Sequence, residues 1–249
     1  MSATTEKKNE GGIGEIINIA FQALVIALVI RTLLFQPFNI PSGSMKATLL
    51  VGDYIFVSKY SYGYTKFSVP FALIPFEGRI WAGMPKRGDV AVFRNPKDEG
   101  TDYIKRVIGL PGDRIQMNNG QLFINGQPVK RELVADWISD DPGMEGKAVK
   151  RYRETLPNGV TYETLDLSDS YYDNTPEYLV PAGHYFMMGD NRDNSTDSRV
   201  QSAVGYVPFE NFIGRAEIIF FSLKEGTAIY ELWRWPFDVR WGRIFSLVR

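Results

Sequence analysis

A long apolar segment near the N-terminus constrains the fold of this chain more than any other feature. Between residues 16 and 34, 15 of 19 residues are apolar, and the helix-breaking residue Pro37 follows. A stretch of this composition predicts a membrane-spanning helix, which we place at residues 13–36. The polar segment at 1–12 then forms a tail, and the rest of the chain has to fold outside the lipid bilayer.

The flanking residues leave two alternatives to a spanning helix. The uncharged run that ends before Arg31 contains 15 residues, about 22 Å of helix, against a hydrocarbon core of roughly 30 Å. Glu15, Asn18 and Gln22 share one helical face, as in a helix that lies on a membrane surface, but the second half is apolar on all sides. A cleaved signal peptide fits less well, because residues 31–39 contain no small-residue cleavage site. The spanning helix remains the preferred prediction.

Composition excludes several classes of function. The chain has 28 basic and 29 acidic residues and no long basic tract, so we expect no nucleic-acid partner. It has no cysteine and a single histidine, His184, which removes disulfides, thiolate nucleophiles and metal sites built from cysteine or several histidines. A Ser-His-Asp triad is open only through that histidine. We expect an activity that needs neither a metal nor another cofactor.

The chain beyond the apolar segment carries a β pattern. Short runs rich in Val, Ile, Phe and Tyr follow glycines at residues 53–59 and 89–94, and predict core strands. Residues 114–179 are more polar, and Asn-Gly pairs there signal hairpins between alternating runs. After the single N-terminal helix we therefore predict a mainly β fold. It comprises an antiparallel β-rich domain at 37–113 and 180–222, interrupted by an inserted β subdomain at 114–179.

Two segments combine aromatic and apolar residues outside this strand pattern. Residues 67–81 are rich in Phe and contain two prolines, which argues against a central strand. Within the C-terminal segment at 223–249, residues 233–245 mix Trp, Phe and Arg, as segments at a membrane surface do. Each segment is either a lid over the protein's own core or a surface that enters the bilayer.

Two serines and one lysine are candidate catalytic residues. Ser42 and Ser44 lie in the short segment PSGSM at 41–45, which proline stiffens and in which glycine allows close approach of a ligand. By itself such a segment is most often a simple turn. Lys105 lies in an apolar strand, where alternation places it on the opposite face from Arg106. One of the two must face inward unless the strand is at a sheet edge.

A buried Lys105 can act on Ser44 without a histidine. A lysine in such a strand usually extends to solvent, and that interpretation stays open. A general base near neutral pH needs its pKa lowered from about 10.4 towards about 7, roughly 4.6 kcal/mol, which burial among apolar groups can supply. Serine is a weak nucleophile until such a base takes its proton. Ser44 and Lys105 are therefore a candidate dyad.

A polar stretch at residues 189–199 contains no large apolar side chain. It predicts a hydrogen-bonded loop rather than a core strand. Asp190, Asp193 and Asp197 offer oxygen ligands for calcium, but their spacing lacks the EF-hand pattern, so we expect no metal there.

Three segments together resemble the bacterial type I signal peptidases, a family of membrane-anchored serine proteases with a Ser/Lys dyad. They are PSGSM at 41–45, YIKRVIGLPGD at 103–113 and GDNRDNSTDSR at 189–199, in the order found in the family. The resemblance covers most of residues 31–222. It implies secretory preproteins as substrates, cut after small-residue A-x-A-like sites. It also implies a single-pass protein of the bacterial inner membrane with a cytoplasmic N-terminus and a catalytic domain on the outer, periplasmic side, an orientation that the nearly even flanking charges do not fix.

The resemblance implies roles for the candidate residues. Ser44 would be the nucleophile and Lys105 the general base. Ser42, together with the backbone N–H of Ser44, would bind the oxyanion. Ser195 would hydrogen-bond the Lys105 amine and orient it. Three further residues would support the polar loop, the last two of them as an ion pair: Asp190, Asp197 and Arg199.

Two other functions remain open on the residues alone. A self-cleaving repressor-type protease also uses a Ser/Lys pair, but it would need a DNA-binding helical domain where this chain has its apolar segment. A non-catalytic, membrane-tethered β scaffold would need the motif residues only for structure. For the peptidase we expect shallow pockets for small side chains, with three candidates to line them: Ile40, Met45 and Tyr54.

Overall fold

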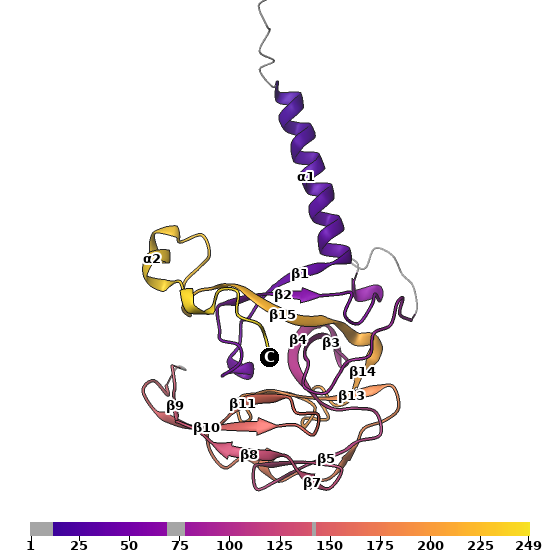
Figure 1. Ribbon diagram of the computed structural model, residues 1–249, viewed down its shortest axis with the longest axis vertical. Helices are drawn as coiled ribbons and strands as arrows, with labels where there is room; N and C mark the ends of the chain where they lie inside the picture. Colours follow the sequence, from indigo (N-terminus) through magenta and orange to yellow (C-terminus); the bar gives the residue numbers. More distant parts are fainter. Residues whose placement is uncertain (1–11, 69–77, 141–142) are drawn as a thin grey trace, which may run out of the picture.

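The structure is a computed structural model that describes residues 12–68, 78–140 and 143–249. A long helix leads into a body built from antiparallel sheets (Figure 1). The mainly β class with an apolar N-terminal helix, predicted from the sequence, is confirmed. Of the predicted tail at 1–12, only Gly12 lies within the described residues.

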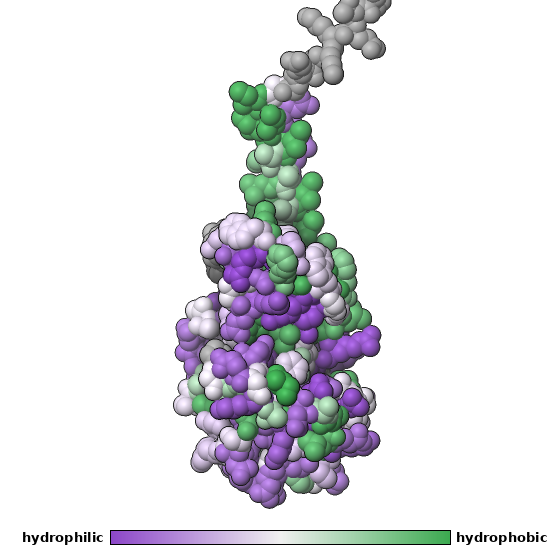
Figure 2. Space-filling model, turned by 90° about the vertical axis from the view of Figure 1, so that its left-hand side faces the viewer, coloured by the Kyte–Doolittle hydropathy of each residue, from purple (hydrophilic) through white to green (hydrophobic). Residues whose placement is uncertain are grey.

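Helix α1 covers Ile13–Leu33 and stands clear of the body (Figure 1). Its 21 residues extend about 32 Å at 1.5 Å per residue, enough for the hydrocarbon core of a bilayer. None of its residues is buried, and its surface is predominantly apolar (Figure 2). The helix has the length and the composition of a membrane-crossing helix. Exposure of so much apolar surface to water would be unfavourable.

The helix joins the first sheet almost without a linker. It ends at Leu33, and β1 begins at Phe35, ahead of the predicted start of the β domain at 37. The backbone N–H of Lys59 donates to the carbonyl of Leu34 (3.0 Å), and the Tyr64 hydroxyl donates to the carbonyl of Leu33 (2.5 Å). These two bonds fix the end of the helix to the chain that follows β2.

Seven antiparallel strands form the main sheet, in the order β1, β2, β15, β3, β4, β13, β14. Their bounds are Phe35–Asn39 (β1), Asp53–Ser58 (β2), Val90–Asn95 (β3), Asp98–Gly109 (β4), His184–Met188 (β13), Val207–Pro208 (β14) and Phe212–Ser222 (β15). The strands predicted at 53–59 and 89–94 are β2 and β3. Pro37 lies in β1, at the edge of the sheet, where a proline is tolerated.

Residues 114–179 contribute two smaller sheets. One contains β5 (Arg114–Asn118), β6 (Gln121–Ile124), β7 (Gln127–Pro128) and β12 (Tyr178–Leu179); the other contains β8 (Lys130–Leu133), β9 (Trp137–Ile138), β10 (Ala148–Thr155) and β11 (Thr161–Asp166). Asn119-Gly120 and Asn125-Gly126 link β5 to β6 and β6 to β7. All four residues have positive φ, as tight hairpin turns require.

The inserted strands share a hydrophobic core with the main sheet. One cluster of buried side chains joins the two regions: Ile108, Phe186 and Met188 from the main sheet, and Ile115, Leu122, Leu156 and Tyr162 from the inserted strands. In this cluster, apolar side chains of both regions are removed from contact with water by packing against one another. Removing the inserted strands would therefore expose part of the core of the main sheet.

The C-terminal segment folds back onto β15. It passes through the one-turn helix α2 (Trp235–Asp238) and then runs beside β15, where the N–H of Val248 donates to the carbonyl of Glu217 (2.9 Å). Four of its aromatic side chains remain largely exposed and are not a lid over the core: Trp233, Phe237, Trp241 and Phe245.

In the other aromatic segment, predicted at 67–81, residues 69–77 lie outside the described residues. Short 3-10 turns are described at Gly43–Met45, Lys66–Ser68, Tyr171–Asp173, Phe209–Asn211, Leu232–Arg234 and Trp241–Arg243.

Replacement of Gly214 by alanine should destabilise the main sheet. Gly214 lies in β15, and a Cβ there would come within 2.4 Å of the carbonyl oxygen of Ser58 on β2. Because that atom belongs to the backbone, the strands have to shift, and overpacking of this kind typically costs about 1–3 kcal/mol. We expect Gly214→Ala to lower the free energy of unfolding in detergent by that amount, while Gly242→Ala, whose Cβ meets no atom within 4 Å, does not. Equal unfolding curves for the two variants would contradict this reading of the packing.

Candidate active site

Ser44 lies in a largely buried turn that is anchored in the core of the main sheet. Ser44 lies in the one-turn 3-10 helix Gly43–Met45, directly after the extended residue Ser42. The side chain of Met45 is fully buried in the core of the main sheet, together with Leu49. The turn therefore holds Ser44, which is 7% exposed, at the surface of a fixed apolar plug.

Lys105 and Arg106 are both buried, although they lie on opposite faces of the sheet. Their strand, β4, lies between β3 and β13 in the sheet, and the low exposure of both side chains shows that both faces of the sheet are covered at this point. Lys105 is 3% exposed and Arg106 is 0% exposed. The interpretation that Lys105 extends to solvent is therefore wrong, because it assumed the more open environment of a strand with one solvated face.

The structure brings the amine of Lys105 to the hydroxyl of Ser44. Lys105 Nζ lies 2.8 Å from Ser44 Oγ and 3.0 Å from the carbonyl oxygen of Ile104. Burial lowers the pKa of Lys105 from its ordinary value of 10.5 to about 8, although the nearby charges of Asp197 and Asp190 act in the opposite direction. With a pKa of about 8, roughly a tenth of the amine is neutral at pH 7 and more at higher pH, and a neutral amine can accept a proton from the hydroxyl.

Ser42 and the turn of Ser44 lie close enough to act on the same group. Ser42 Oγ is 3.4 Å from Ser44 Oγ, so both hydroxyls can contact the same substrate group. Ser42, Ser44 and Lys105 all line a cavity of about 580 Å³. The rest of its lining comes from Pro41, from residues 101–104 of β4, from Tyr172, and from residues 193–196 and Val200.

The three residues suggested for small side-chain pockets lie elsewhere. Ile40 and Met45 are buried in the core, and neither they nor Tyr54 lines this cavity. Tyr54 lies on β2 and packs against Phe220 and Phe221. That these three residues line pockets for small side chains stays a prediction.

Ser195 does not bind the amine of Lys105 directly. Its hydroxyl donates to Asp197 Oδ2 (2.9 Å), and the part of the chain that the structure describes contains no hydrogen bond between Ser195 and Lys105. Arg199 binds both carboxylate oxygens of Asp197, through Nε (2.9 Å) and Nη2 (2.8 Å), which is the ion pair expected from the sequence. Burial alone would raise the pKa of Asp197, but Arg199 and the hydrogen bonds hold it below its usual range.

Asp190 forms a second buried ion pair, with a partner that the sequence did not single out. Arg106 Nε and Nη2 bind the two oxygens of Asp190 at 2.8 and 2.6 Å, and Thr48 donates to Asp190 as well (2.5 Å). Asp190 and Asp197, two of the three carboxylates considered as calcium ligands, are thus both neutralised by arginines. The sequence offered one indication of this ion pair: Arg106 lies beside Lys105 in an apolar strand, and a buried arginine needs a carboxylate partner.

Asn191 connects the polar loop to the turn of Ser44. Its backbone N–H donates to the carbonyl of Ser44, and its Nδ2 donates to the carbonyl of Gly43, both at 3.1 Å. Gly189 lies equally close, since a Cβ there would come within 2.6 Å of the Ser44 carbonyl oxygen. Asn191 lies inside the motif at 189–199, but nothing in the sequence indicates which polar residue of that motif reaches the turn.

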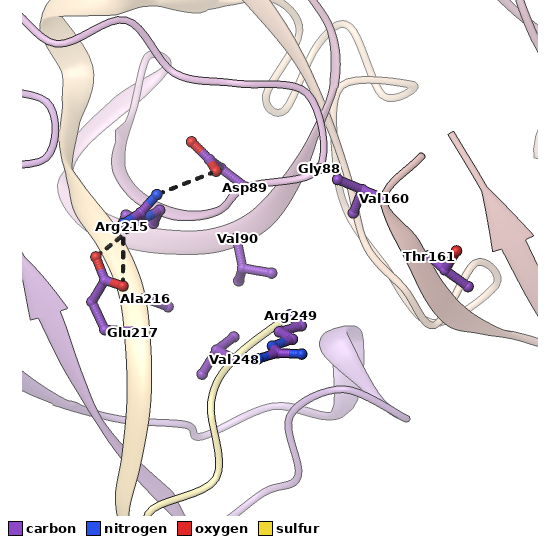
Figure 3. Close-up of a pocket in the computed structure, with 10 residues that line it drawn as sticks. All are labelled: Gly88, Asp89, Val90, Val160, Thr161, Arg215, Ala216, Glu217, Val248 and Arg249. Carbon is purple, nitrogen blue, oxygen red and sulfur yellow. Dashed lines mark hydrogen bonds and ion pairs between the residues drawn. The ribbon is translucent and has the colours of Figure 1, made fainter. Parts of the chain in front are cut away.

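A second cavity, of about 460 Å³, lies where the main sheet, Val160 and the C-terminal strand meet (Figure 3). Its acidic side chains are already paired, because Arg215 lies 2.9 Å from Glu217 and 3.8 Å from Asp89. None of the residues predicted for the site lines it. We treat it as a gap between two sheets and not as an active site.

Comparison with known proteins then decides the family. A sequence profile described as "Signal peptidase, peptidase S26" matches residues 13–221. The chain belongs to this family of signal peptidases. Signal peptidase I of Rickettsia typhi (strain ATCC VR-144 / Wilmington) is 45% identical over 264 residues, which cover 99% of this chain and 97% of that protein. Signal peptidase I of Rickettsia canadensis (strain McKiel) is 48% identical over 238 residues, with 88% of each chain covered.

A crystal structure of a signal peptidase I from Enterococcus faecalis V583 is 28% identical and covers 53% of this chain and 96% of its own. Its TM-score of 0.31 is too low to support a structural comparison. The family predicted from the three motifs is confirmed by the sequence matches alone. As a member of peptidase S26 with an apolar helix ahead of its β body, the protein is a peptidase with the features of a membrane-anchored enzyme.

The buried amine should make stability depend on pH in a defined window. Unfolded lysine titrates near 10.5 and folded Lys105 near 8, so between these values the unfolded chain binds a proton that the folded chain lacks. The free energy of unfolding should therefore rise with pH in this window, by about 3 kcal/mol relative to the variant Lys105→Met. Denaturant unfolding of both proteins at several pH values measures the difference. A difference that stays constant from pH 8 to 10.5 would show that Lys105 titrates normally.

Proposed function

We propose that the protein removes signal peptides from secretory preproteins with Ser44 as nucleophile and Lys105 as general base. One distance supports this most directly: the amine and the hydroxyl lie 2.8 Å apart, with both side chains buried. At this separation the neutral amine can take the hydroxyl proton while Ser44 Oγ attacks the scissile carbonyl carbon. Membership of the signal peptidase family supplies the substrate class.

The reaction then follows in two halves. Attack by Ser44 produces a tetrahedral intermediate, whose oxyanion accepts hydrogen bonds from the Ser42 hydroxyl and the backbone N–H of Ser44. The protonated amine of Lys105 gives its proton to the leaving nitrogen, which becomes the new N-terminus of the mature protein. A water molecule, deprotonated by the same amine, next attacks the acyl-enzyme; the ester bond to Ser44 Oγ breaks, the ammonium of Lys105 returns its proton to Ser44 Oγ, and the signal peptide leaves with a new C-terminal carboxyl group. Each half returns Lys105 to its neutral form.

The polar loop at 189–199 sets how readily the amine changes charge. In this proposal Asp197 offsets part of the cost of a protonated Lys105, because a buried negative charge stabilises a nearby cation. Ser195 and Arg199 hold Asp197 in place, and Arg106 does the same for Asp190. Ser195 thus acts on the amine through Asp197.

The membrane brings the site and its substrate together. We propose that α1 crosses the membrane with the N-terminus in the cytoplasm and the β body on the outer side, and that cleavage follows small-residue A-x-A-like sites. Figure 1 shows α2 at the end of the body from which α1 leaves. The exposed Trp233 and Trp241 on either side of α2 are well suited to the interface between lipid and water.

Loss of either member of the dyad should abolish cleavage. We expect Ser44→Ala and Lys105→Met to lower kcat on a preprotein with an Ala-x-Ala site by at least about 10³-fold, the usual cost of removing a nucleophile or its base. The full chain in detergent and a gel assay of the cleaved preprotein measure this. Lys130→Met, at an exposed lysine paired with Glu132, is the matched control and should cleave at the wild-type rate.

The same assay separates the alternatives. A non-catalytic scaffold leaves the preprotein uncut by the wild type as well. A self-cleaving protease cuts its own chain and spares the added preprotein. Cleavage of the preprotein at equal rates by the wild type and both dyad variants would contradict the roles given to Ser44 and Lys105.

The pH profile of cleavage should report the lowered pKa of Lys105. Since only the neutral amine accepts the proton of Ser44, kcat/KM should rise with pH through an apparent pKa of about 8. Initial rates between pH 6 and about 10.5 measure it, with a buffer control at each overlap. A rise centred near the ordinary lysine value of about 10.4 would contradict the buried base.

A further inference from the structure

The inserted sheet forms backbone hydrogen bonds with the loop that supports the dyad. The N–H of Leu165 on β11 donates to the carbonyl of Asp190, and the N–H of Arg192 donates to the carbonyl of Leu165, both at 2.9 Å. Residues 190–192 thus lie against β11 as a short additional strand. In this segment the backbone N–H and the side chain of Asn191 bind Ser44 and Gly43.

A buried ion pair fixes the same segment from the side of the inserted sheet. Glu154 on β10 is 0% exposed and binds Arg192 through both oxygens, at 3.0 and 2.6 Å. The Tyr162 hydroxyl on β11 donates to Glu154 (2.8 Å), and the guanidinium of Arg106 lies over the Tyr162 ring at 4.2 Å. The two buried arginines, one beside Lys105 and one beside Asn191, therefore meet on the inserted sheet.

A third contact reaches the turn of Ser44 itself. Lys46, two residues after Ser44, is 1% exposed and its amine lies 2.5 Å from Asp140 Oδ1, in the connection between β9 and β10. The inserted sheet and its β9–β10 connection therefore contact both segments that meet at the active site: the segment of Asn191 through Arg192, and the turn of Ser44 through Lys46. A cavity lined by Val160, Thr161 and residues of β3 and β15 lies elsewhere between the two regions (Figure 3).

We infer that the sheet of β8, β9, β10 and β11 positions the active site, and that Glu154 is its principal positioning residue. The inference rests on the proposed function of Ser44 and Lys105. Glu154 touches neither of them; it holds Arg192, and the backbone of Arg192 and its neighbours holds Asn191 against the turn of Ser44. A buried ion pair is rarely more stabilising than an apolar pair of the same size, but its geometry is strict, which suits a positioning role.

A displacement of this segment should reduce turnover and leave substrate binding unchanged. Misplacement of a reacting group by about 1 Å can cost about 100-fold in rate. We expect Glu154→Gln to lower kcat by at least 10-fold, with KM changed less than twofold. Glu163→Gln on the neighbouring strand removes a carboxylate paired at the surface with Arg151, and as the matched control it should retain wild-type kcat.

Two milder variants keep the test decisive if Glu154→Gln does not fold. Tyr162→Phe removes only the hydroxyl that orients Glu154, and Asp140→Asn, at a half-exposed side chain, removes the charge that binds Lys46. Each should lower kcat by about 3- to 10-fold with KM unchanged, an effect of the size that loss of one such contact gives. Kinetics and melting temperature are recorded for every variant, together with Ser44→Ala as the inactive reference.

The outcomes separate this inference from the proposed function. Activity in Ser44→Ala would overturn the proposed function, and with it the basis of the inference. An inactive Ser44→Ala together with wild-type kcat in every folded variant of the inserted sheet would overturn the inference alone. A lower melting temperature at unchanged kcat, or an equal loss of kcat in Glu163→Gln, would also overturn it, because either result indicates a purely structural role.

Discussion

The site depends on the burial of one lysine beside one arginine in an interior strand. Both faces of β4 are covered at this point, by the turn of Ser44 beside Lys105 and by Tyr162 of the inserted sheet beside Arg106, so both side chains are buried. Arg106 stays charged and forms a bidentate ion pair with Asp190. In the described ranges no carboxylate lies within ion-pair distance of Lys105, so burial outweighs the more distant charges of Asp197 and Asp190 and lowers the pKa of its amine. Because successive residues of a strand point to opposite faces, the permanently charged Arg106 and the titrating Lys105 lie on opposite sides of the sheet.

The polar loop provides the second requirement, which is a fixed distance between the amine and the hydroxyl. Lys105 belongs to β4 and Ser44 to a turn that follows β1, and these strands are not neighbours in the sheet. Asn191 closes this gap, because its two hydrogen bonds hold the turn while the backbone on either side of it pairs with β11. The chemistry therefore depends on segments from four distant parts of the sequence, and their arrangement is set by buried polar contacts more than by apolar packing.

Much of this organisation could be predicted from the sequence, because the signals are local. Apolar length predicted α1, short β-branched runs predicted β2 and β3, and three motifs in order predicted the family. The pairing of Asp197 with Arg199 could be expected because the two residues are close neighbours in one loop. Such features depend on residues within one element or one motif, where spacing alone carries the information.

Contacts between distant segments could not be predicted in this way. Glu154 lies among ordinary alternating residues of β10, and only the folded structure shows that Arg192 faces it. The direction of the Ser195 hydroxyl, towards Asp197 and not towards Lys105, depends on a loop whose course the motif does not specify. The complete burial of Met45, next to the candidate nucleophile, likewise depends on the folded core of the main sheet and not on the motif itself.

The direct junction between α1 and β1 has a consequence for where the chemistry can take place. Only ten residues separate Leu33 from Ser44, a span of at most about 35 Å even when fully extended. Hydrogen bonds from Lys59 and Tyr64 remove the slack that a free linker would allow. In the proposed arrangement, with α1 in the membrane, this short connection keeps the hydroxyl of Ser44 at a fixed distance from the lipid surface, so that only peptide bonds presented at that distance can be cut.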